Sequence, residues 1–564
     1  MTSSNSNFKY WSLFYEDEGF DITGNKIMGR QAAGWSYLKA LIKNTNYLSV
    51  YLRNIKNKNL LLEKIKPLLD KDKELSLNLI NYLEPQKSSN CGGIFYPSPG
   101  ICNLSSNRSY HGHDAYSIVG ITHTTASHNV MSDIAKLAFS NVMPWDAVIC
   151  TSESVLDTVN KILNHQYDRM SSKFSIKNIV YPKFPVIPLG IDTDEFNFSD
   201  DFVINSRKDL NIGKDDIVIV YVGRLSFHAK AHHLPMYLAL EQCSKELKNN
   251  QKIHIIQTGW FPNDPVRDIF INEGKKICPS INFHFLDGTD QHNKHKTLAA
   301  GDIFISLSDN IQETFGITPL EGMASQLPVI VSDWNGYKST VRNDLDGYRV
   351  KTYALQPGLG EDLAYNHMMD SINYDHYIGM SVQRVAIDVS DCIQKLKILI
   401  FDKNKRLEYG KNAKKRAHDF FNWPVILGQY RELSKELTNI RNTEKDNFIK
   451  FNEKSLPSDR LDPFYIFSSY PTDSLNREQN FTKLDEVNPI PIKDLLKFGS
   501  INYSKNFLPS DGDINIILKL FDRYNYLNLE KIMTITNFDE TKTYKILIFL
   551  LKYGYLTISG EESE

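Results

Sequence analysis

DIFISLSDNIQETFGITPLEGMASQLPVIVSD, residues 302–333, is the stretch that decides the fold of this chain. It contains two apolar runs, 302–309 and 328–333, and each run ends in small or polar residues. A helical pattern lies between them, with Pro319 suited to a first helical turn. Strands joined through a helix form parallel sheets, whose ligands bind at the carboxyl ends of the strands. The stretch therefore predicts an α/β sheet with a binding edge.

Further apolar runs on both sides extend this pattern into two series. The second series begins with IVIVYVGRLS (217–226), IHIIQTGW (253–260) and INFHFLDG (281–288), and the intervals between them leave room for helices. The first series has candidate strands at Tyr47–Leu52, Ser117–Thr122, Ala147–Thr151 and Phe184–Leu189, with helical patterns such as Arg30–Lys43 and Met131–Asn141. Two such series predict two doubly wound, Rossmann-like domains that face a cleft.

The domain boundaries follow changes in composition. We expect an N-terminal domain over 1–205, completed by a closing helix at about 424–440, and a second domain over 206–423. Residues 441–512 are rich in Asn, Asp, Lys, Ser and Pro, which indicates an extended arm or linker. Residues 513–564 show three helical patterns and then a strand, an order that resembles a winged-helix module. The third part is therefore predicted to be a small, mainly helical domain.

The bulk composition is that of a soluble globular protein. The chain has 564 residues, 41% hydrophobic and 23% charged residues, and a net charge of -2. The polar N-terminus resembles no secretory signal, and no apolar run reaches the roughly 18 residues of a spanning helix. The six cysteines are scattered without a Cys-x-x-Cys pair, which argues against a disulfide framework. These features predict a cytoplasmic protein with two to four domains.

Two acids in the deciding stretch carry the first functional hypothesis. Glu313 and Glu321 flank the start of the predicted helix, where backbone N–H groups can receive an anion such as a diphosphate. A carboxylate there can also accept hydrogen bonds from ribose or sugar hydroxyls. The alternative is a surface turn whose acids only favour the helix start. The flanking strands and the presence of both acids favour a binding site.

Several motifs occur in the order seen in a known enzyme family. Residues 313–321 resemble the E-x7-E signature of family 4 retaining glycosyltransferases. VIPLGIDTDEF (186–196) is similar to that family's interdomain segment, and VGRLSFHAK (222–230) is similar to its phosphate-binding segment. DGYRV (346–350) resembles a turn after the last sheet strand, and FFNWPVILGQYREL (420–433) resembles the closing helix. The resemblance covers about residues 15–440 and implies the two-domain GT-B fold.

The resemblance also implies roles for individual residues. The donor would be a nucleoside-diphosphate sugar bound mainly by the second domain, with Arg224 and Lys230 on its diphosphate. Glu321 would bind the ribose, Glu313 would lie near the transferred sugar, and the backbone of Thr314, Phe315 and Gly316 would touch sugar or phosphate. The spacing from Arg224 to Lys230 is one residue longer than the usual family form, which leaves the placement of Lys230 open.

Two features of the first domain complete the candidate site. His123 follows the strand SIVGIT (117–122) and matches the family position of a His near the donor sugar; a satisfied core or loop His is the alternative. KIMGRQAAGWSYLKAL (26–41) resembles the Gly-rich turn and first helix of that domain. Gly29 would allow a close backbone approach there, and Arg30 would meet phosphate or an acidic acceptor.

No metal and no cofactor are predicted. Three His clusters invite a metal interpretation: His111 with His113 and Asp114, His228 with His232 and His233, and His292 with His295. None has the spacing of the three or four converging ligands that a zinc site needs. The family chemistry is also independent of metal, and the nucleotide sugar is a substrate rather than a cofactor.

Several alternatives and partners remain open at this point. A phosphorylase, an epimerase or a non-catalytic binding protein could share the fold. The acceptor could be a protein, a lipid-linked glycan or a small metabolite. Residues 511–564 contain six Lys and Arg against nine Asp and Glu, so nucleic acid is disfavoured as a partner of the C-terminal module. Protein or peptide docking, dimerisation or simple packing are the remaining roles for it.

Overall fold

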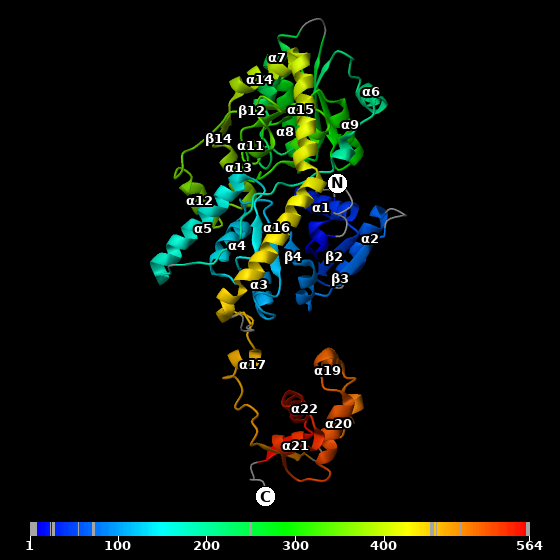
Figure 1. Ribbon diagram of the computed structural model, residues 1–564, viewed down its shortest axis with the longest axis vertical. Coiled ribbons are helices and arrows are strands. Elements are labelled where there is room, and N and C mark those ends of the chain that lie inside the picture. The colour runs from blue at the N-terminus through cyan, green and yellow to red at the C-terminus, as the bar shows by residue number, and fades with distance from the viewer. Residues whose placement is uncertain are drawn as a thin grey trace. The chain divides into compact units, whose positions relative to one another are not determined.

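The computed structural model describes residues 8–22, 24, 29–54, 56–69, 74–176, 178–247, 251–451, 456–457, 459–484 and 487–559. The chain forms two compact units, Met1–Pro457 and Ser458–Glu564. The first unit contains two parallel six-stranded sheets (Figure 1).

The N-terminal sheet has the strand order β3-β2-β1-β4-β5-β6, and every pairing is parallel. Its strands are β1 Ser12–Tyr15, β2 Tyr47–Leu52, β3 Ser76–Ile80, β4 Gly93–Tyr96, β5 Ser117–Ile121 and β6 Ala147–Ile149. All residues of β1, β5 and β6 are buried, as expected for a parallel sheet covered by helices on both faces. The order reverses between β1 and β4, which places the ligand-binding edge near the ends of these central strands.

The second sheet repeats this topology, with the order β12-β11-β10-β7-β8-β9 and parallel pairings throughout. Its strands are β7 Ile217–Val222, β8 Ile253–Gly259, β9 Asn282–Asp287, β10 Ile303–Ser306, β11 Val329–Ser332 and β12 Gly347–Val350. β7 and β8 are buried along their whole length. Here the order reverses between β7 and β10, the strands that precede Arg224 and Glu313.

The helices of the first unit alternate with these strands. They are α1 Gly29–Asn44, α2 Lys56–Ile65, α3 Cys102–Ser109, α4 His128–Lys136, α5 Glu153–Phe174, α6 Asp200–Asp209, α7 Leu234–Ser244, α8 Asp264–Ile277, α9 Gln291–Ala300, α10 Ile317–Ala324, α11 Tyr337–Thr340, α12 Glu361–Met368, α13 Tyr374–Val382, α14 Val389–Phe401, α15 Lys403–Phe421 and α16 Trp423–Glu444. The predicted pair of doubly wound domains is therefore confirmed.

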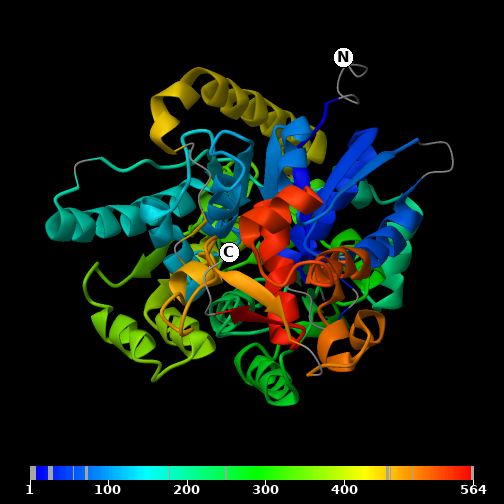
Figure 2. The same ribbon diagram turned by 90° about the horizontal axis from the view of Figure 1, so that it is seen from below.

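Helix α16 returns the chain to the N-terminal domain after the second sheet is complete. Its Trp423 and Tyr430 pack against Tyr37 of α1, and Tyr430 also lies against Trp11 and Phe95. Near its C-terminal end, Arg441 donates to the carbonyl oxygen of Gly92 at 2.9 Å. Figures 1 and 2 show α16, in yellow to gold, alongside the blue and cyan N-terminal domain.

The structure confirms some of the strands predicted from the sequence and contradicts one of them. All five runs of the second series are strands, and β2 has the expected bounds. The expected strand Phe184–Leu189 was wrong: the structure has only isolated bridges at Lys183 and Val186 there. Pro182, Pro185 and Pro188 remove ladder donors from this segment, which explains the absence of a regular strand. The short strands β1, β3 and β4 were not anticipated.

The second unit forms its own core around a small antiparallel sheet in the order β16-β15-β17. It contains α17 Pro463–Ile466, β15 Asn480–Lys483, α18 Ile492–Leu495, α19 Gly499–Asn502, α20 Asp511–Leu520, β16 Leu527–Asn528, α21 Leu529–Thr536, α22 Glu540–Lys552 and β17 Leu556–Ser559. The extended arm expected over 441–512 is therefore too long. Phe481, Ile492 and Leu495 are buried in the same core as α20–α22, so the compact unit begins well before residue 513.

Among the described residues, no helix combines the length and the apolar character that crossing a bilayer requires.

Candidate functional site

The loop between β10 and α10 is shaped by Gly316. Its φ of 84° is in the left-handed region, and a Cβ there would lie 2.0 Å from the Cε1 atom of Tyr337. Any other residue would clash with this ring, so glycine is required for the turn into α10. The turn places Glu313, which lies three residues before Gly316, at the carboxyl edge of the second sheet.

Glu313 lies in a nearly buried ion pair. Its carboxylate contacts the Nζ atom of Lys230, and the two side chains are only 10% and 18% exposed. Burial raises the pKa of Glu313, but Lys230, the N–H of Phe315 and Arg224 together bring it below its ordinary value. Glu313 is therefore a carboxylate at neutral pH, fixed beside two cations.

The loop after β7 supplies both cations. Arg224 donates from Nη2 to the carbonyl oxygen of Ala229 at 3.0 Å and lies 5.9 Å from the ring centroid of Trp260. The longer spacing from Arg224 to Lys230 is accommodated by a turn, in which the N–H of Lys230 donates to the carbonyl oxygen of Ser226. The structure thus brings Arg224, Lys230 and Glu313 together.

Glu321 lies on α10 and forms a second polar centre. Its Oε1 atom accepts from Nζ of Lys294 at 2.8 Å, and the residue is 7% exposed. Its Oε2 atom is buried and has no hydrogen-bond partner within the described part of the chain. A buried carboxylate oxygen without a donor is costly, so this atom is suited to accept from a ligand hydroxyl.

Lys294 is a site residue that the sequence did not indicate. It lies on α9, and its Nζ atom is 5.8 Å from the ring centroid of Phe196, which belongs to the interdomain segment. The pattern QHNKHK in α9 resembles an ordinary polar helix face, and only the tertiary structure shows which of its cations reaches Glu321.

His123 follows β5 and lies where the two domains meet. Its carbonyl oxygen accepts from the hydroxyl of Thr314 at 2.9 Å, and the hydroxyl of Ser152 donates to the carbonyl oxygen of Thr314 at 3.0 Å. We call this junction the interdomain seam. Burial and, to a lesser extent, Arg30 lower the pKa of His123 to about 4, so its imidazole is neutral at pH 7.

The other residues predicted for the site differ in whether they are available to a ligand. Phe315 is 2% exposed and its ring packs against Phe421, so only its backbone is available for a ligand. Arg30, expected to meet phosphate or an acidic acceptor, pairs with Glu18 at 3.1 Å. A Cβ on Gly29 would meet nothing within 4 Å, so the close approach expected there is not required in this structure. The turn itself, residues 25–28, lies outside the described residues.

In the His cluster of residues 228–233, two side chains form a hydrogen bond and a ring stack. His233 bonds Glu273 at 2.6 Å, and the ring of His232 stacks on that of His233 at a centroid distance of 5.2 Å. Within the residues that the structure describes, no group of three or more His, Cys, Asp and Glu side chains could hold a metal ion.

Asp309 is a further buried acid of the site. It is 3% exposed, and its Oδ1 atom accepts from the N–H of His232 at 3.3 Å. Burial raises the pKa of Asp309 to about 7, well above the value of 3.8 for a free carboxyl. The folded state therefore holds this proton more tightly than the unfolded chain, and its contribution to stability is lost as the pH rises from about 4 to about 7.

Replacing Asp309 should remove its contribution to the pH dependence of stability. We expect Asp309→Asn to raise the free energy of unfolding at pH 8 relative to wild type, by up to about 4 kcal/mol for three pKa units, and to change little at pH 4. Urea unfolding of both proteins at several pH values measures this difference. If the two proteins differed in their free energy of unfolding by the same amount at pH 4 and at pH 8, protonation of Asp309 would not be the cause of the difference.

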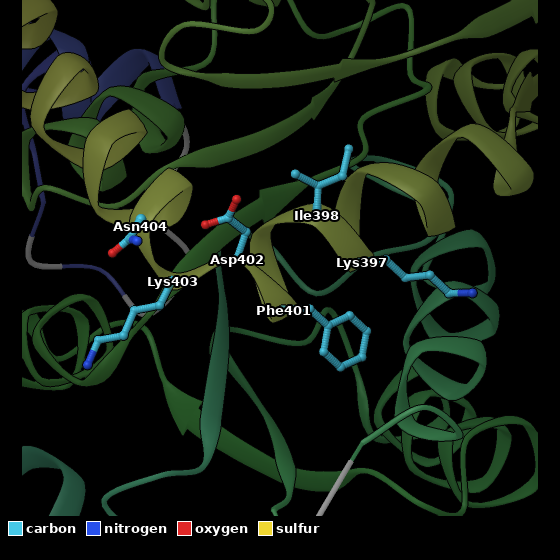
Figure 3. Close-up of a pocket in the computed structure, with 6 residues that line it drawn as sticks. All are labelled: Lys397, Ile398, Phe401, Asp402, Lys403 and Asn404. Atoms are coloured by element: carbon cyan, nitrogen blue, oxygen red, sulfur yellow. The ribbon is translucent and has the colours of Figure 1, made fainter.

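A surface hollow of about 560 Å³ lies elsewhere, at the junction of α14 and α15 (Figure 3). Its residues do not converge: Lys397 and Lys403 point in opposite directions in Figure 3. Lys397 pairs with Glu246, and Asp402 caps α15 by accepting from the N–H of Lys405 at 2.9 Å. These contacts stabilise helices and offer no catalytic group.

Comparisons with known proteins match part of the chain to glycosyltransferases. Residues 203–359 match the family model "Glycosyl transferases group 1". An uncharacterized glycosyltransferase of Methanocaldococcus jannaschii is 29% identical over 177 residues, which are 31% of this chain and 42% of that protein. A D-inositol 3-phosphate glycosyltransferase of Geodermatophilus obscurus is 25% identical over 170 residues, 29% of this chain and 36% of that one. The chain thus spans less than half the length of these relatives.

Solved structures with a similar course of the chain were also found. Anabaena HepE, solved with UDP and glucose, is 15% identical, covers 75% of this chain and 99% of its own, and has a TM-score of 0.47. The sucrose-phosphate synthase of Thermosynechococcus elongatus is 14% identical, with 76% and 98% coverage and a TM-score of 0.46. The matched region 203–359 contains Arg224, Lys230, Glu313 and Glu321.

Proposed function

We propose that this chain is a retaining glycosyltransferase that transfers a sugar from a nucleoside-diphosphate sugar to an acceptor. One observation carries the proposal. The carboxyl edge of the second sheet holds a buried, unpaired carboxylate oxygen on Glu321 and, at the start of the same loop–helix segment, a Glu313 carboxylate fixed beside Lys230 and Arg224. A nucleotide sugar has hydroxyl donors and a diphosphate that match these two centres.

The donor would be held at two places. Ribose hydroxyls would donate to Glu321 Oε2, whose other oxygen Lys294 already fixes. The diphosphate would lie near Arg224 and Lys230, which come from the loop after β7. A guanidinium provides a forked pair of donors, and an ammonium provides a compact charge, so the two together suit a phosphate group.

The chemistry would depend on stabilising the leaving group. Negative charge develops on the diphosphate as the bond to the sugar breaks, and fixed cations lower the energy of that state. Glu313 holds Lys230 in place before the donor arrives and would bond hydroxyls of the transferred sugar. His123, neutral at pH 7, would donate or accept a hydrogen bond without adding charge.

Retention of the anomeric configuration belongs to this proposal. The N-terminal motifs offer no carboxylate that stands out as a nucleophile, which favours a front-side attack assisted by the leaving phosphate. The bonds between Thr314, His123 and Ser152 hold the two domains together at the seam, and this arrangement would limit the access of water to the donor.

Simple assays distinguish three alternative functions from the proposed one. A phosphorylase would consume inorganic phosphate, and an epimerase would change the configuration of the sugar without transferring it to an acceptor. A non-catalytic binding protein would bind the nucleotide sugar and leave it intact. The retention of Arg224, Lys230 and both Glu residues at one edge favours the transferase.

The acceptor and the C-terminal unit require separate proposals. The acceptor could be a protein, a lipid-linked glycan or a small molecule. For residues 458–564 we propose a docking or dimerisation role in a cytoplasmic protein, and a winged-helix assignment remains a prediction. Pulldown with and without residues 458–564 would show whether this unit recruits the acceptor.

A donor panel tests the proposed function. Purified protein is mixed with nucleoside diphosphates and nucleotide sugars, with and without EDTA, and scored by thermal shift and by release of nucleoside diphosphate. Binding to the native state should raise the melting temperature. We expect one donor class to stabilise the protein and to be turned over equally well in EDTA, because Arg224 and Lys230 supply the positive charge. Strict dependence on a divalent cation would contradict the metal-free mechanism.

A further inference from the structure

The segment between β12 and α14 leaves the second sheet and returns to it. Its base is a two-stranded antiparallel ladder of β13 Thr352–Ala354 with β14 Val385–Ile387. Helices α12 and α13 lie between these strands. We call residues 352–387 the insert; Figure 1 shows its helices close to α4 and α5 of the N-terminal domain.

Helix α13 of the insert is fixed against both domains. Ile378 is fully buried in a cluster with Ala126 of the N-terminal domain and Ala229 of the second domain. On α12, the ring of His367 lies 6.1 Å from that of His128 at the start of α4. The insert therefore contacts the seam from the side on which Arg224 and Glu313 lie.

Tyr374, the first residue of α13, forms a hydrogen bond through its hydroxyl to the loop that carries Glu313. That hydroxyl donates to Oε1 of Gln312 at 3.1 Å, and Gln312 directly precedes Glu313. Burial raises the pKa of Tyr374, while a hydrogen bond from Thr124 and the nearby charge of Arg224 act in the opposite direction. Thr124 directly follows His123.

One hydroxyl thus lies beside three predicted site residues. It donates to Gln312, the neighbour of Glu313, and it lies within electrostatic reach of Arg224 and near Thr124, the neighbour of His123. An amide is planar, so a bond to one end of the Gln312 side chain also fixes the direction of its other end. The amide nitrogen at that other end can then donate to a hydroxyl of a sugar held near Glu313.

We propose that Tyr374 is a positioning residue of the transfer site: its hydroxyl orients the Gln312 amide toward the hydroxyl groups of the transferred sugar. This proposal rests on the proposed glycosyltransferase function. Gln312 and Tyr374 then determine which sugar is placed at Glu313, while Glu321 and Lys294 bind the nucleotide. The two parts of the donor are recognised by separate groups of residues.

The test is a double-mutant cycle of Tyr374→Phe and Gln312→Ala. The Phe variant removes one oxygen atom and keeps the ring that packs beside Ile378. We expect Tyr374→Phe to lower kcat for transfer about tenfold and to leave the Kd for the nucleoside diphosphate within about twofold of wild type. In the double variant, the loss should equal that of Gln312→Ala alone, because the hydroxyl acts through the amide.

Tyr377→Phe is the matched control, since Tyr377 lies on the same helix and stacks on His367 at a centroid distance of 4.3 Å. It should keep the wild-type kcat. Wild-type kcat in Tyr374→Phe, or losses that add in the double variant, would overturn the proposal while leaving the transferase function intact. A wild-type chain that neither binds nor turns over any nucleotide sugar would overturn the proposed function and this proposal together.

Discussion

Replacing Glu313 by Gln should lower the turnover of the donor by about 10²–10³-fold, with little change in the affinity for the nucleoside diphosphate. The substitution keeps the shape of the side chain and removes its charge. Lys230 then loses the partner that holds it, and the transferred sugar loses a charged acceptor of its hydroxyl groups. Steady-state kinetics together with calorimetry on the nucleotide separates these two effects.

Glu246→Gln is the control for this experiment. Glu246 forms an ion pair with Lys397 in the same domain, but that pair is partly exposed to solvent, and its Lys397 lines the hollow beside α14. Its loss should change neither kcat nor affinity, because an exposed pair contributes little. Near-normal turnover in Glu313→Gln would show that Glu313 does not contribute to sugar transfer.

Lys230→Met should have the second large effect. It removes the cation that lies against Glu313, and we expect turnover to fall by about 10²-fold because the leaving diphosphate loses a fixed positive charge. It should also change the pH profile. Burial raises the pKa of Glu313, and Lys230 is the first of the groups that lower it, so this pKa must rise in the variant.

The direction of the pH effect follows from this change. A rate that requires the Glu313 carboxylate is lost when the pH falls below the pKa of that group, so the acid limb of the profile should move to higher pH in Lys230→Met. Lys397→Met, from the exposed pair with Glu246, should leave the profile unchanged. An acid limb at the wild-type pH in Lys230→Met would show that another group controls it.

The second sheet could be predicted from the sequence because its strands are long and uniformly apolar. β7 and β8 are buried over six and seven residues, and such runs are hard to assign to anything but buried strands. β1 and β4 have only four residues each, too few for a pattern to be visible. Phe184–Leu189 was apolar enough to resemble a strand, but its prolines prevent a regular ladder.

The proximity of the candidate site residues could be predicted only as far as single segments of the sequence carry information. Glu313, Glu321, Arg224 and Lys230 follow strands whose ends share one edge, so their proximity could be expected. Lys294, Gln312 and Tyr374 could not be expected, because each reaches the site from a helix or loop with an ordinary polar pattern. Their contacts depend on how α9 and the insert pack in the tertiary structure. The spacing of apolar and polar residues along the sequence does not reveal this packing.

The most direct test of the central claim compares wild type with Glu321→Gln on the donor that the panel identifies. The account predicts that wild type binds this nucleotide sugar and releases nucleoside diphosphate from it. In Glu321→Gln the affinity should fall about tenfold or more, since the acceptor of the ribose hydroxyls loses its charge. Equal affinity in the two proteins, or no binding of any nucleotide sugar by wild type, would contradict it.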